Sequence, residues 1–310
     1  MAPLPDRAHI NPSWRLLDVM SAARLALGTV QFGLAYGVSN SSGKVTPEEA
    51  ARILLHAHEV GIDTLDTAIA YGQSENVLGQ IGMVGWNVIS KLPAVPDHVP
   101  SVAEWVVDQV AQSMQRLGVQ HLEGLLLHRP DQLLGPDGRG LWSALEGLRA
   151  HGRVRKIGVS IYSHEELLRL TRGRHFDLVQ APLNILDRSL VDSGWARRLK
   201  EQGAELHVRS AFLQGLLLME SSRPPKFNRW QPLWRQWEAW LLEHKLSPLQ
   251  GCLRYCCSVP EVDRVVVGVE SSRQLREIID AANGSMPAPP PTWCMPVDEM
   301  LANPANWNLL

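Results

Sequence analysis

The chain has 310 residues, a formal net charge of −2, 45% hydrophobic residues and 20% charged residues, which is the composition of an ordinary soluble globular protein. The weak net charge gives no support to a nucleic-acid partner, and no apolar stretch is long enough to cross a membrane or to form the core of a signal peptide. The four cysteines form no CxxC pair and no disulfide ladder, so we expect a reducing, cytoplasmic compartment and no metal site.

The N-terminal residues differ in pattern from the rest of the chain. Residues 1–22 mix charged with apolar residues and predict an extension that is poorly ordered. Met20 within it is an alternative start to Met1. We expect residues 23–310 to form one domain that ends in a C-terminal tail.

From residue 24 onward, short apolar runs alternate with amphipathic helices that carry capping signals. The first run, residues 24–30, predicts a strand. The helix after it opens with Thr46 as N-cap, Pro47 at the first helical position and Glu49 closing a capping box. Further strands are expected over residues 62–66, 86–91, 122–128, 154–160, 177–182, 205–210 and 263–269. Further helices are expected over residues 74–82, 101–118, 139–151, from 163 onward, 190–202, 248–258 and 271–282.

This order makes about eight successive strand–helix units. The strands are rich in Val, Leu and Ile and do not alternate strongly, which is typical of parallel strands that are buried on both faces. About eight such units in roughly 260 residues predict an α/β fold of the (β/α)8 TIM-barrel type in a single domain. No GxGxxG motif follows the first strand, so an open dinucleotide-binding sheet loses its main support.

Two segments near the end of the chain do not follow the strand–helix order. The Trp- and Pro-rich insert over residues 219–240 is long for a connection, and two interpretations of it stay open. Long loops in compact domains are often functional lids, but this one is equally consistent with a surface elaboration whose tryptophans pack together. We expect the C-terminal tail to pack under the barrel.

Polar residues or glycine end seven successive predicted strands. In a barrel of this kind these ends surround one cleft, where the chemistry of the protein belongs. A single polar residue at a strand end is usually a cap or a solvated group, but their convergence indicates a functional site. The strand-end residues are Asp66, Lys91, His128, Ser160, Gln180, Arg209 with Ser210, and Gly268.

Three of these strand-end residues, together with Tyr71 on the loop after the strand that ends at Asp66, form a coherent chemical group. A free tyrosine titrates at about 10 and is a slow acid at neutral pH, but an ammonium group beside it favours the phenolate. Lys91 supplies the ammonium for Tyr71, and the carboxylate of Asp66 keeps Lys91 charged. A histidine across the cleft, His128, can donate a hydrogen bond to a substrate oxygen. Such a group suits carbonyl reduction, in which a hydride reaches carbon and a proton reaches oxygen.

Several ordered motifs resemble those of the aldo-keto reductase superfamily, in its bacterial branch. They are "DTAIAYGQSE", "ISKL", "LLLHRPD", "KIGVS", "VQAPLN" and "FLQGLL", and they run from about residue 25 to residue 280. The resemblance implies a nicotinamide-dependent barrel enzyme. In it, Tyr71 would be the general acid, Lys91 the group that tunes it, Asp66 the partner of Lys91, and His128 the residue that orients the substrate.

The same resemblance implies a set of cofactor-binding residues. Ser160 and Gln180 would bind the nicotinamide carboxamide, while Ile161 replaces an Asn of the family pattern. Arg209 stands where many members have an aromatic residue that stacks on nicotinamide, and a planar guanidinium can also stack. The other implied cofactor-binding residues are Gly28, Thr29, Ser210, Phe212, Gln214, Gly215, Gly268, Gln274 and Glu277.

The choice between the two nicotinamide cofactors depends on Glu270. This residue falls where the family often has an Arg that binds the 2'-phosphate of NADPH. A carboxylate there would repel that phosphate and accept a hydrogen bond from a 2'-hydroxyl instead. Arg273 and Arg276 are candidates to compensate for the missing Arg. The family as a whole favours NADPH, which is the expectation, and Glu270 makes NADH a serious alternative.

The resulting functional hypothesis is an NAD(P)H-dependent reductase that converts an aldehyde or ketone to an alcohol. The loops after the first, fourth and seventh strands mix aromatic with polar groups, which is compatible with a small carbonyl substrate that is sugar-like or otherwise hydroxylated. The alternative is a cofactor-binding regulatory or scaffold protein on the same fold with little turnover, since fold does not fix function. A different barrel enzyme, such as a sugar-phosphate isomerase, has no additional phosphate-binding signal to support it. The natural substrate, the direction of the reaction and the oligomeric state are not specified by the sequence.

Overall fold

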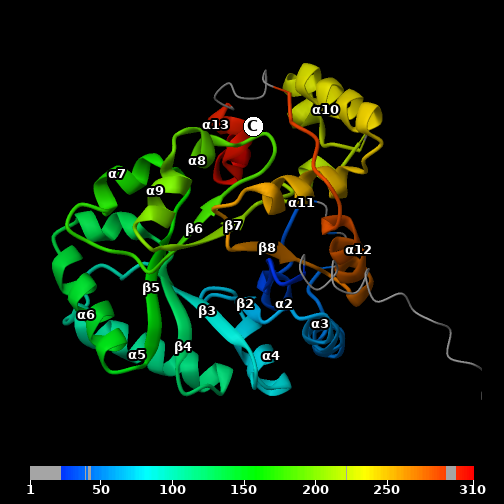
Figure 1. Cartoon of the computed structure of the whole chain (residues 1–310). Coiled ribbons are helices and arrows are strands. Elements are labelled where there is room, and N and C mark those ends of the chain that lie inside the picture. The colour runs from blue at the N-terminus through cyan, green and yellow to red at the C-terminus, as the bar shows by residue number, and fades with distance from the viewer. Residues whose placement is uncertain (1–21, 39, 41–42, 221, 291–297) are drawn as a thin grey trace, which may run out of the picture.

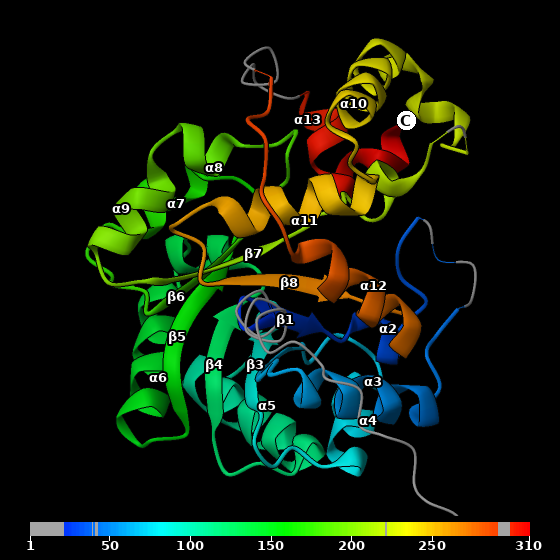
Figure 2. The same ribbon diagram turned by 45° about the vertical axis from the view of Figure 1, so that its right-hand side comes forward.

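Eight parallel strands pair in the order of the sequence and close into a barrel, as Figures 1 and 2 show. The computed structural model describes residues 22–38, 40, 43–220, 222–290 and 298–310. The strands are β1 (Leu25–Gly28), β2 (Thr64–Asp66), β3 (Asn87–Leu92), β4 (Leu122–Leu127), β5 (Val154–Ser160), β6 (Leu178–Pro182), β7 (Glu205–Arg209) and β8 (Arg264–Gly268). Pairing of β8 with β1, from Leu25 opposite Val265 to Gly28 opposite Gly268, closes the sheet. The predicted (β/α)8 fold in a single domain is confirmed.

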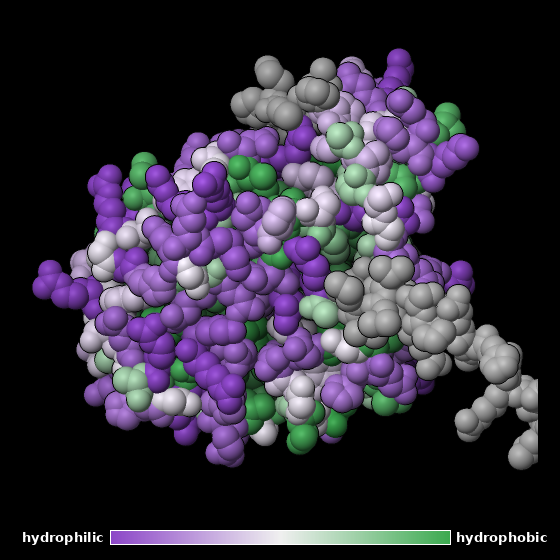
Figure 3. All heavy atoms as spheres, viewed as in Figure 1, coloured by the Kyte–Doolittle hydropathy of each residue, from purple (hydrophilic) through white to green (hydrophobic). Residues whose placement is uncertain are grey.

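Helices follow the strands and cover the outside of the barrel. The α-helices are α2 (Val30–Gly33), α3 (Pro47–Glu59), α4 (Ser74–Ile81), α5 (Val102–Leu117), α6 (Gly138–Ala150), α7 (Glu165–Leu170), α8 (Ser189–Asp192), α9 (Trp195–Glu201), α10 (Gln231–His244), α11 (Pro248–Ser258), α12 (Ser272–Ala282) and α13 (Glu299–Ala302). The 3-10 helices are η1 (Pro130–Leu134), η2 (Leu216–Leu218), η3 (Pro225–Trp230) and η5 (Pro304–Leu309). The face seen in Figure 3 is mainly hydrophilic, because the apolar stripe of each amphipathic helix points toward the strands.

Two local predictions needed correction. Thr46 caps α3 through the backbone N–H of Glu49, but the Glu49 carboxylate does not close the box: it accepts hydrogen bonds from Arg52 Nε at 2.7 Å and from the backbone N–H of Ser272 at 2.6 Å. The single helix expected over 190–202 is divided into α8 and α9, because Gly194 adopts a left-handed conformation with φ of 77°.

The barrel interior is polar near both ends and apolar in the middle. Near the strand starts, Lys156 lies 2.9 Å from Glu123 and 2.5 Å from Glu205. Ile89, Leu126 and Leu178 form a separate buried cluster at mid-height, which we call the barrel plug. Gly124 makes room for it, since a Cβ there would lie 2.8 Å from Ile89 and 3.1 Å from Leu178.

The insert after β7 contains a helix that the sequence analysis did not predict, α10. Its tryptophans Trp234, Trp237 and Trp240 are 1%, 0% and 4% exposed, so the packing interpretation of the insert describes these residues. In Figures 1 and 2 the insert and the C-terminal segment lie next to each other.

The expectation that the C-terminal tail packs under the barrel was wrong. Pro304 and Ala305 of η5 line a cavity at the C-terminal ends of the strands, which is the opposite end of the barrel. The tail lies there because Trp307 packs against Phe227 of the insert.

The predicted N-terminal extension and Met20 lie outside the described residues. Of the helices in the described part of the chain, none combines the length and the apolar character needed to cross a membrane.

Candidate active site

A cavity of about 680 Å³ opens at the C-terminal ends of the strands. Every residue predicted for catalysis or cofactor binding lines it, and so does Glu270. The predicted residues come from the ends of β1 to β8, from the loops after β2 and β7, and from the start of α12. The closed parallel barrel therefore brings together side chains that lie far apart in the sequence.

Asp66 and Lys91 form a buried ion pair at the base of this cleft. The Lys91 ammonium lies 2.5 Å from Asp66 Oδ1 and donates to the carbonyl oxygen of Thr67 at 3.0 Å. The other carboxylate oxygen of Asp66 accepts a hydrogen bond of 2.7 Å from the Gln180 amide. Both Asp66 and Lys91 are almost completely buried, at 4% and 1% exposed, and their mutual position is fixed by these contacts.

Tyr71 lies on the loop after β2, beside this pair. The Lys91 ammonium is 5.1 Å from the centroid of the phenol ring, and the His128 ring meets the same phenol edge-on at 6.1 Å. Gly33 lets the chain of α2 approach this loop, since a Cβ there would lie 1.7 Å from the carbonyl oxygen of Tyr71. The loop is thereby held between α2 and the start of α4.

The electrostatic environment shifts the pKa values of Lys91 and His128 in opposite directions. Burial by itself would lower the pKa of Lys91, but Asp66 and Tyr71 together outweigh it and raise the pKa above its ordinary value. Burial lowers the pKa of His128 to about 4, and the positive charges of Lys91 and Arg209 add to this effect. At neutral pH the cleft therefore holds a lysine ammonium and an uncharged imidazole with one N–H to donate.

Comparison with known proteins agrees with this arrangement. A model of the aldo/keto reductase family matches residues 24–288. The chain belongs to this family. Among characterised proteins, the reductase is 25% identical over 303 residues to the NADH-specific methylglyoxal reductase of Escherichia coli (strain K12), covering 85% of this chain and 91% of that one. It is 30% identical over 171 residues to the NADPH-dependent codeinone reductase 1-2 of Papaver somniferum, covering 47% of this chain and 51% of the other.

Solved structures agree on the fold of the reductase. The aldo-keto reductase AKR11C1 of Bacillus halodurans in its holo form superimposes with a TM-score of 0.64 at 21% identity, covering 86% of this chain and 88% of that one. The glycerol dehydrogenase AKR11B4 of Gluconobacter oxydans gives a TM-score of 0.66 at 21% identity, with coverage of 85% and 88%. As a member of this family, the chain is a reductase of carbonyl compounds that uses a nicotinamide cofactor.

The cleft of the reductase is lined by polar groups along its length. It runs from the Asp66–Lys91 pair to Gln274 and Glu277 on α12. The buried amide oxygen of Gln31, which also lines the cleft, has no hydrogen-bond partner in the described part of the chain. The side chain of Gln31 lies flat on Gly268, where a Cβ would come within 2.5 Å of it. The residues present therefore fit a nicotinamide cofactor.

Some predicted cofactor residues already have partners of their own. The Thr29 hydroxyl donates to the carbonyl oxygen of Asp66 at 3.0 Å and accepts from Ser74 at 2.9 Å, so it fixes the ends of β1 and β2. Ser160 donates to the Gln180 amide oxygen at 3.3 Å. Ile161, which replaces the family Asn, is completely buried and does not line the cleft.

Arg209 is oriented by groups that leave its charge unneutralised. Its guanidinium lies 4.7 Å from the Tyr162 ring centroid and donates to the carbonyl oxygen of Ile161 at 2.9 Å and to the Ser210 hydroxyl at 3.2 Å. None of these partners is a carboxylate.

The loop after β7 is folded tightly against the cleft. Ser210, Leu213 and Gln214 have φ of 63°, 48° and 52°. Left-handed backbone costs such residues about 1–2 kcal/mol each, so neighbouring contacts must hold the loop. Gln214 provides two of them: its carbonyl oxygen accepts from the backbone N–H of Val38 at 3.1 Å, and its amide donates to the Tyr36 hydroxyl at 3.0 Å.

Sequence reasoning missed several lining residues. Tyr162 follows β5 by two positions, and a search of the residues just beyond each strand end would have found it. Gln31 and Tyr36 lie in the segment after β1, which the sequence analysis assigned to the substrate as a whole without singling out either residue. Pro304 and Ala305 carry no sequence signal of their own.

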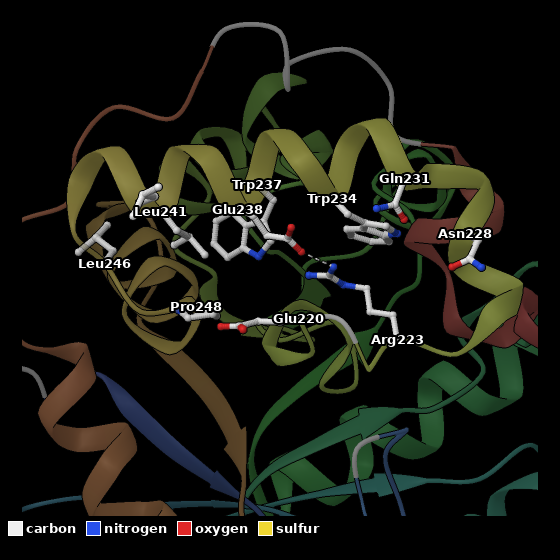
Figure 4. Close-up of a pocket in the computed structure, with 11 residues that line it drawn as sticks. Glu220, Arg223, Asn228, Gln231, Trp234, Trp237, Glu238, Leu241, Leu246 and Pro248 are labelled. Carbon is white, nitrogen blue, oxygen red and sulfur yellow. Dashed lines mark hydrogen bonds and ion pairs between the residues drawn. The ribbon is translucent and has the colours of Figure 1, made fainter.

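A second cavity, of about 630 Å³, lies within the insert (Figure 4). It is lined by α10, by the segment before η3 and by the start of α11. Arg223 crosses it, 4.6 Å from the Trp234 ring centroid and 2.7 Å from the Glu238 carboxylate. No residue lines both cavities. Within the described ranges, no group of His, Cys, Asp and Glu has the arrangement of a metal site.

Proposed function

We propose that this aldo-keto reductase reduces an aldehyde or ketone to the alcohol, with Tyr71 as the proton donor. The observation that carries the proposal is the joint position of Tyr71, the Lys91 ammonium and the neutral His128 at the base of one cleft. A reduced nicotinamide supplies the hydride when it is bound.

Each of the four side chains has a distinct task in this proposal. Asp66 keeps Lys91 charged and pointed at Tyr71, so the phenolate left after proton transfer lies beside a positive charge. The neutral His128 donates its N–H to the carbonyl oxygen and orients the substrate. Water is kept from the pair by burial, which strengthens both interactions.

The cofactor residues follow from their positions along the cleft. We assign Ser160, Gln180 and Arg209 to the nicotinamide end. Ser210, Phe212, Gln214 and Gly215, with Gly28 and Thr29 opposite, are assigned to the ribose and pyrophosphate. Gly268, Gln274 and Glu277 are assigned to the adenosine end. Because Gln180 is already bound to Asp66, its contact with the carboxamide would couple cofactor position to the Asp66–Lys91 pair.

The mutation of Tyr71→Phe tests the proton donor. It should lower the rate of carbonyl reduction on the order of a hundredfold or more, because general acid catalysis is lost while the ring stays in place. The decrease of reduced-cofactor absorbance with a panel of aldehydes measures the rate. The dissociation constant of the cofactor should stay within about twofold of wild type. Equal rates in the two proteins would remove Tyr71 from this role.

For the cofactor, we propose NADH in place of the family-weighted expectation of NADPH. Glu270 and Glu277 both line the adenosine end, while the cations that line the cleft, Lys91 and Arg209, lie at its base. The Glu277 carboxylate is ion-paired with Arg273 at 2.9 Å, so Glu270 is the residue that would repel a 2'-phosphate, and it can accept a hydrogen bond from a 2'-hydroxyl. The Escherichia coli relative, which covers most of the chain, is NADH-specific by name.

The substitution Glu270→Arg tests the choice of cofactor. Wild type should bind NADH more tightly than NADPH, and the variant should shift the ratio of the two dissociation constants toward NADPH at least about tenfold. Quenching of protein fluorescence measures both constants. Tighter binding of NADPH by wild type would restore the first expectation.

For the substrate, we propose a chemical class and not a single compound. The hydroxyls of Tyr36 and Tyr162 line the cleft and can bind a small hydroxylated, sugar-like carbonyl compound. A carbonyl panel of short sugars, ketoaldehydes and aromatic aldehydes measures this preference. If the protein binds the cofactor but reduces no carbonyl compound, a regulatory or scaffold role replaces the enzymatic one.

A further inference from the structure

The far wall of the cleft is built by the C-terminal segment, and that segment is held by the insert. We propose that Lys226, Phe227 and Trp307, which we call the latch, position this wall and so determine which substituents a carbonyl substrate can carry. The inference rests on the proposed function, because it concerns the same cleft.

The wall consists of Pro304 and Ala305, the first residues of η5. Leu218 of η2, just before the insert, and Leu249 of α11 line the cleft as well. None of these side chains can form a hydrogen bond. They shape the space of the cleft and do not anchor a polar group, unlike the residues assigned above to the cofactor.

The latch fixes η5 from behind this wall. The Lys226 ammonium donates to the carbonyl oxygen of Trp307 at 2.7 Å. The rings of Phe227 and Trp307 meet edge to face, with centroids 4.9 Å apart and an interplanar angle of 78°. Phe227 is completely buried and Trp307 is 4% exposed, so this contact is part of the core.

The other side of the latch is attached to the rest of the molecule. The Trp234 indole donates to the carbonyl oxygen of Phe227 at 2.9 Å, and the Trp237 indole donates to that of Leu217 at 3.2 Å. Trp237 also lies against Gly251 of α11, where a Cβ would come within 2.8 Å of the ring. The position of the insert is therefore transmitted through Trp307 to the wall, although no latch residue lines the cleft.

The wall should discriminate between carbonyl substrates by the size of their substituents and not by the reactivity of the carbonyl group. A carbonyl compound with a small substituent occupies only the region near Tyr71 and His128. In the proposal, a bulky apolar substituent extends away from them and packs against the wall, whose lining side chains are apolar. Loosening the wall should weaken binding of the second kind and leave the first unchanged, because the groups around the reacting carbon do not move.

Methylglyoxal and phenylglyoxal provide a matched pair, because they share the reacting ketoaldehyde and differ in one substituent. In Phe227→Leu, the KM for phenylglyoxal should rise about tenfold, while the KM for methylglyoxal and kcat for both stay within about twofold. Lys226→Met, at an exposed position, removes only the hydrogen bond to Trp307 and should give a smaller change of the same kind. This second variant keeps the test valid if Phe227→Leu does not fold.

Two control variants distinguish the loss of the latch contacts from a general disturbance of the insert or the tail. Glu238→Gln alters the same insert at its ion pair with Arg223, and Leu309→Ala alters the tail at a residue that is 72% exposed. Both should leave the two KM values unchanged. The inference is overturned if the latch variants change both KM values equally, if the controls match them, or if cofactor dissociation alone changes. Absence of turnover with both ketoaldehydes and the whole carbonyl panel in wild type would instead reject the proposed function, and this inference with it.

Discussion

Asp66 contacts three other residues that line the cleft. One carboxylate oxygen binds Lys91 and the other binds Gln180, so the carboxylate connects the proposed proton-transfer group to the proposed nicotinamide end. The carbonyl oxygen of the same residue accepts from the Thr29 hydroxyl. Its removal would leave a buried, unpaired ammonium, which is costly in a protein interior.

At the same scale, the titration of His128 can be predicted. Burial and the nearby positive charges lower its pKa to about 4, so the imidazole stays neutral as the pH falls through the range in which a free histidine becomes charged. The pH profile of kcat/KM should therefore show no limb near 6.5 that depends on His128. An NMR titration of the imidazole, assigned by comparison with His128→Gln, should give a midpoint near 4. A midpoint between about 6 and 7 would contradict the electrostatic argument.

The sequence identified the polar strand ends but not their mutual contacts. The rule that chemistry gathers at the C-terminal ends of barrel strands was enough to find Asp66, Lys91 and His128. The hydrogen bond between Gln180 and Asp66 was not predictable, since those residues lie four strands apart and meet only across the closed barrel.

At the scale of elements, Glu75 joins α4 to its neighbours. The carboxylate is 2% exposed and accepts hydrogen bonds from Ser90 of β3 at 2.8 Å and from Ser113 and Arg116 of α5 at 2.6 and 2.8 Å. Since α4 follows the Tyr71 loop directly, these contacts also fix the loop. The sequence analysis assigned no role to this residue.

Replacement of Glu75 should be expensive in stability. Glu75→Ala leaves two hydroxyls and a guanidinium without their acceptor, and we expect the free energy of unfolding to fall by about 2–4 kcal/mol. Urea unfolding measures this change. Glu59→Ala, at a side chain that is 62% exposed, is the matched control and should stay within about 0.5 kcal/mol of wild type. A similar small effect in both variants would show that the Glu75 contacts contribute little.

The elements themselves were predictable where capping and periodicity agree. Helices α3, α5, α11 and α12 fulfil both conditions, whereas the strands are marked by short runs rich in Val, Leu and Ile. In the insert, the prolines obscured a helical pattern: Trp234, Trp237 and Leu241 are spaced by three and four residues, and Pro232 lies in the first turn, where a helix tolerates it. The tail has no such pattern, because its place is set by contact with Phe227 and not by local sequence.

For the whole molecule, the charged group at the strand starts links stability to pH. Glu205 lies 3.1 Å from His207 Nε2 and 2.5 Å from Lys156. The hydrogen bond from His207, and after it the one from Lys156, lower the pKa of Glu205 from 4.5 to about 2 although burial opposes this shift. The unfolded chain therefore binds more protons between these values. The contribution of Glu205 is fully present above about pH 4.5 and is lost as the pH falls toward 2.

Urea unfolding of wild type and Glu205→Gln as a function of pH tests this linkage. Wild type should be more stable than the variant at neutral pH, and the difference should shrink as the pH falls from about 5 to about 2. Comparison of the two proteins cancels the acid sensitivity of all other carboxylates. Curves that remain parallel down to pH 2 would show that Glu205 is not linked to folding in this way.

The barrel plug has a consequence for the supply of protons. Ile89, Leu126 and Leu178 offer no group that could relay a proton, and they fill the middle of the barrel below the Asp66–Lys91 pair. In the part of the interior that these three side chains fill, they separate solvent at the strand starts from Tyr71, the proposed proton donor. In the proposed reaction, the proton that Tyr71 gives up would be replaced from the mouth of the barrel, through the space that the newly formed alcohol would occupy, so recharging of the acid would wait until that alcohol has left.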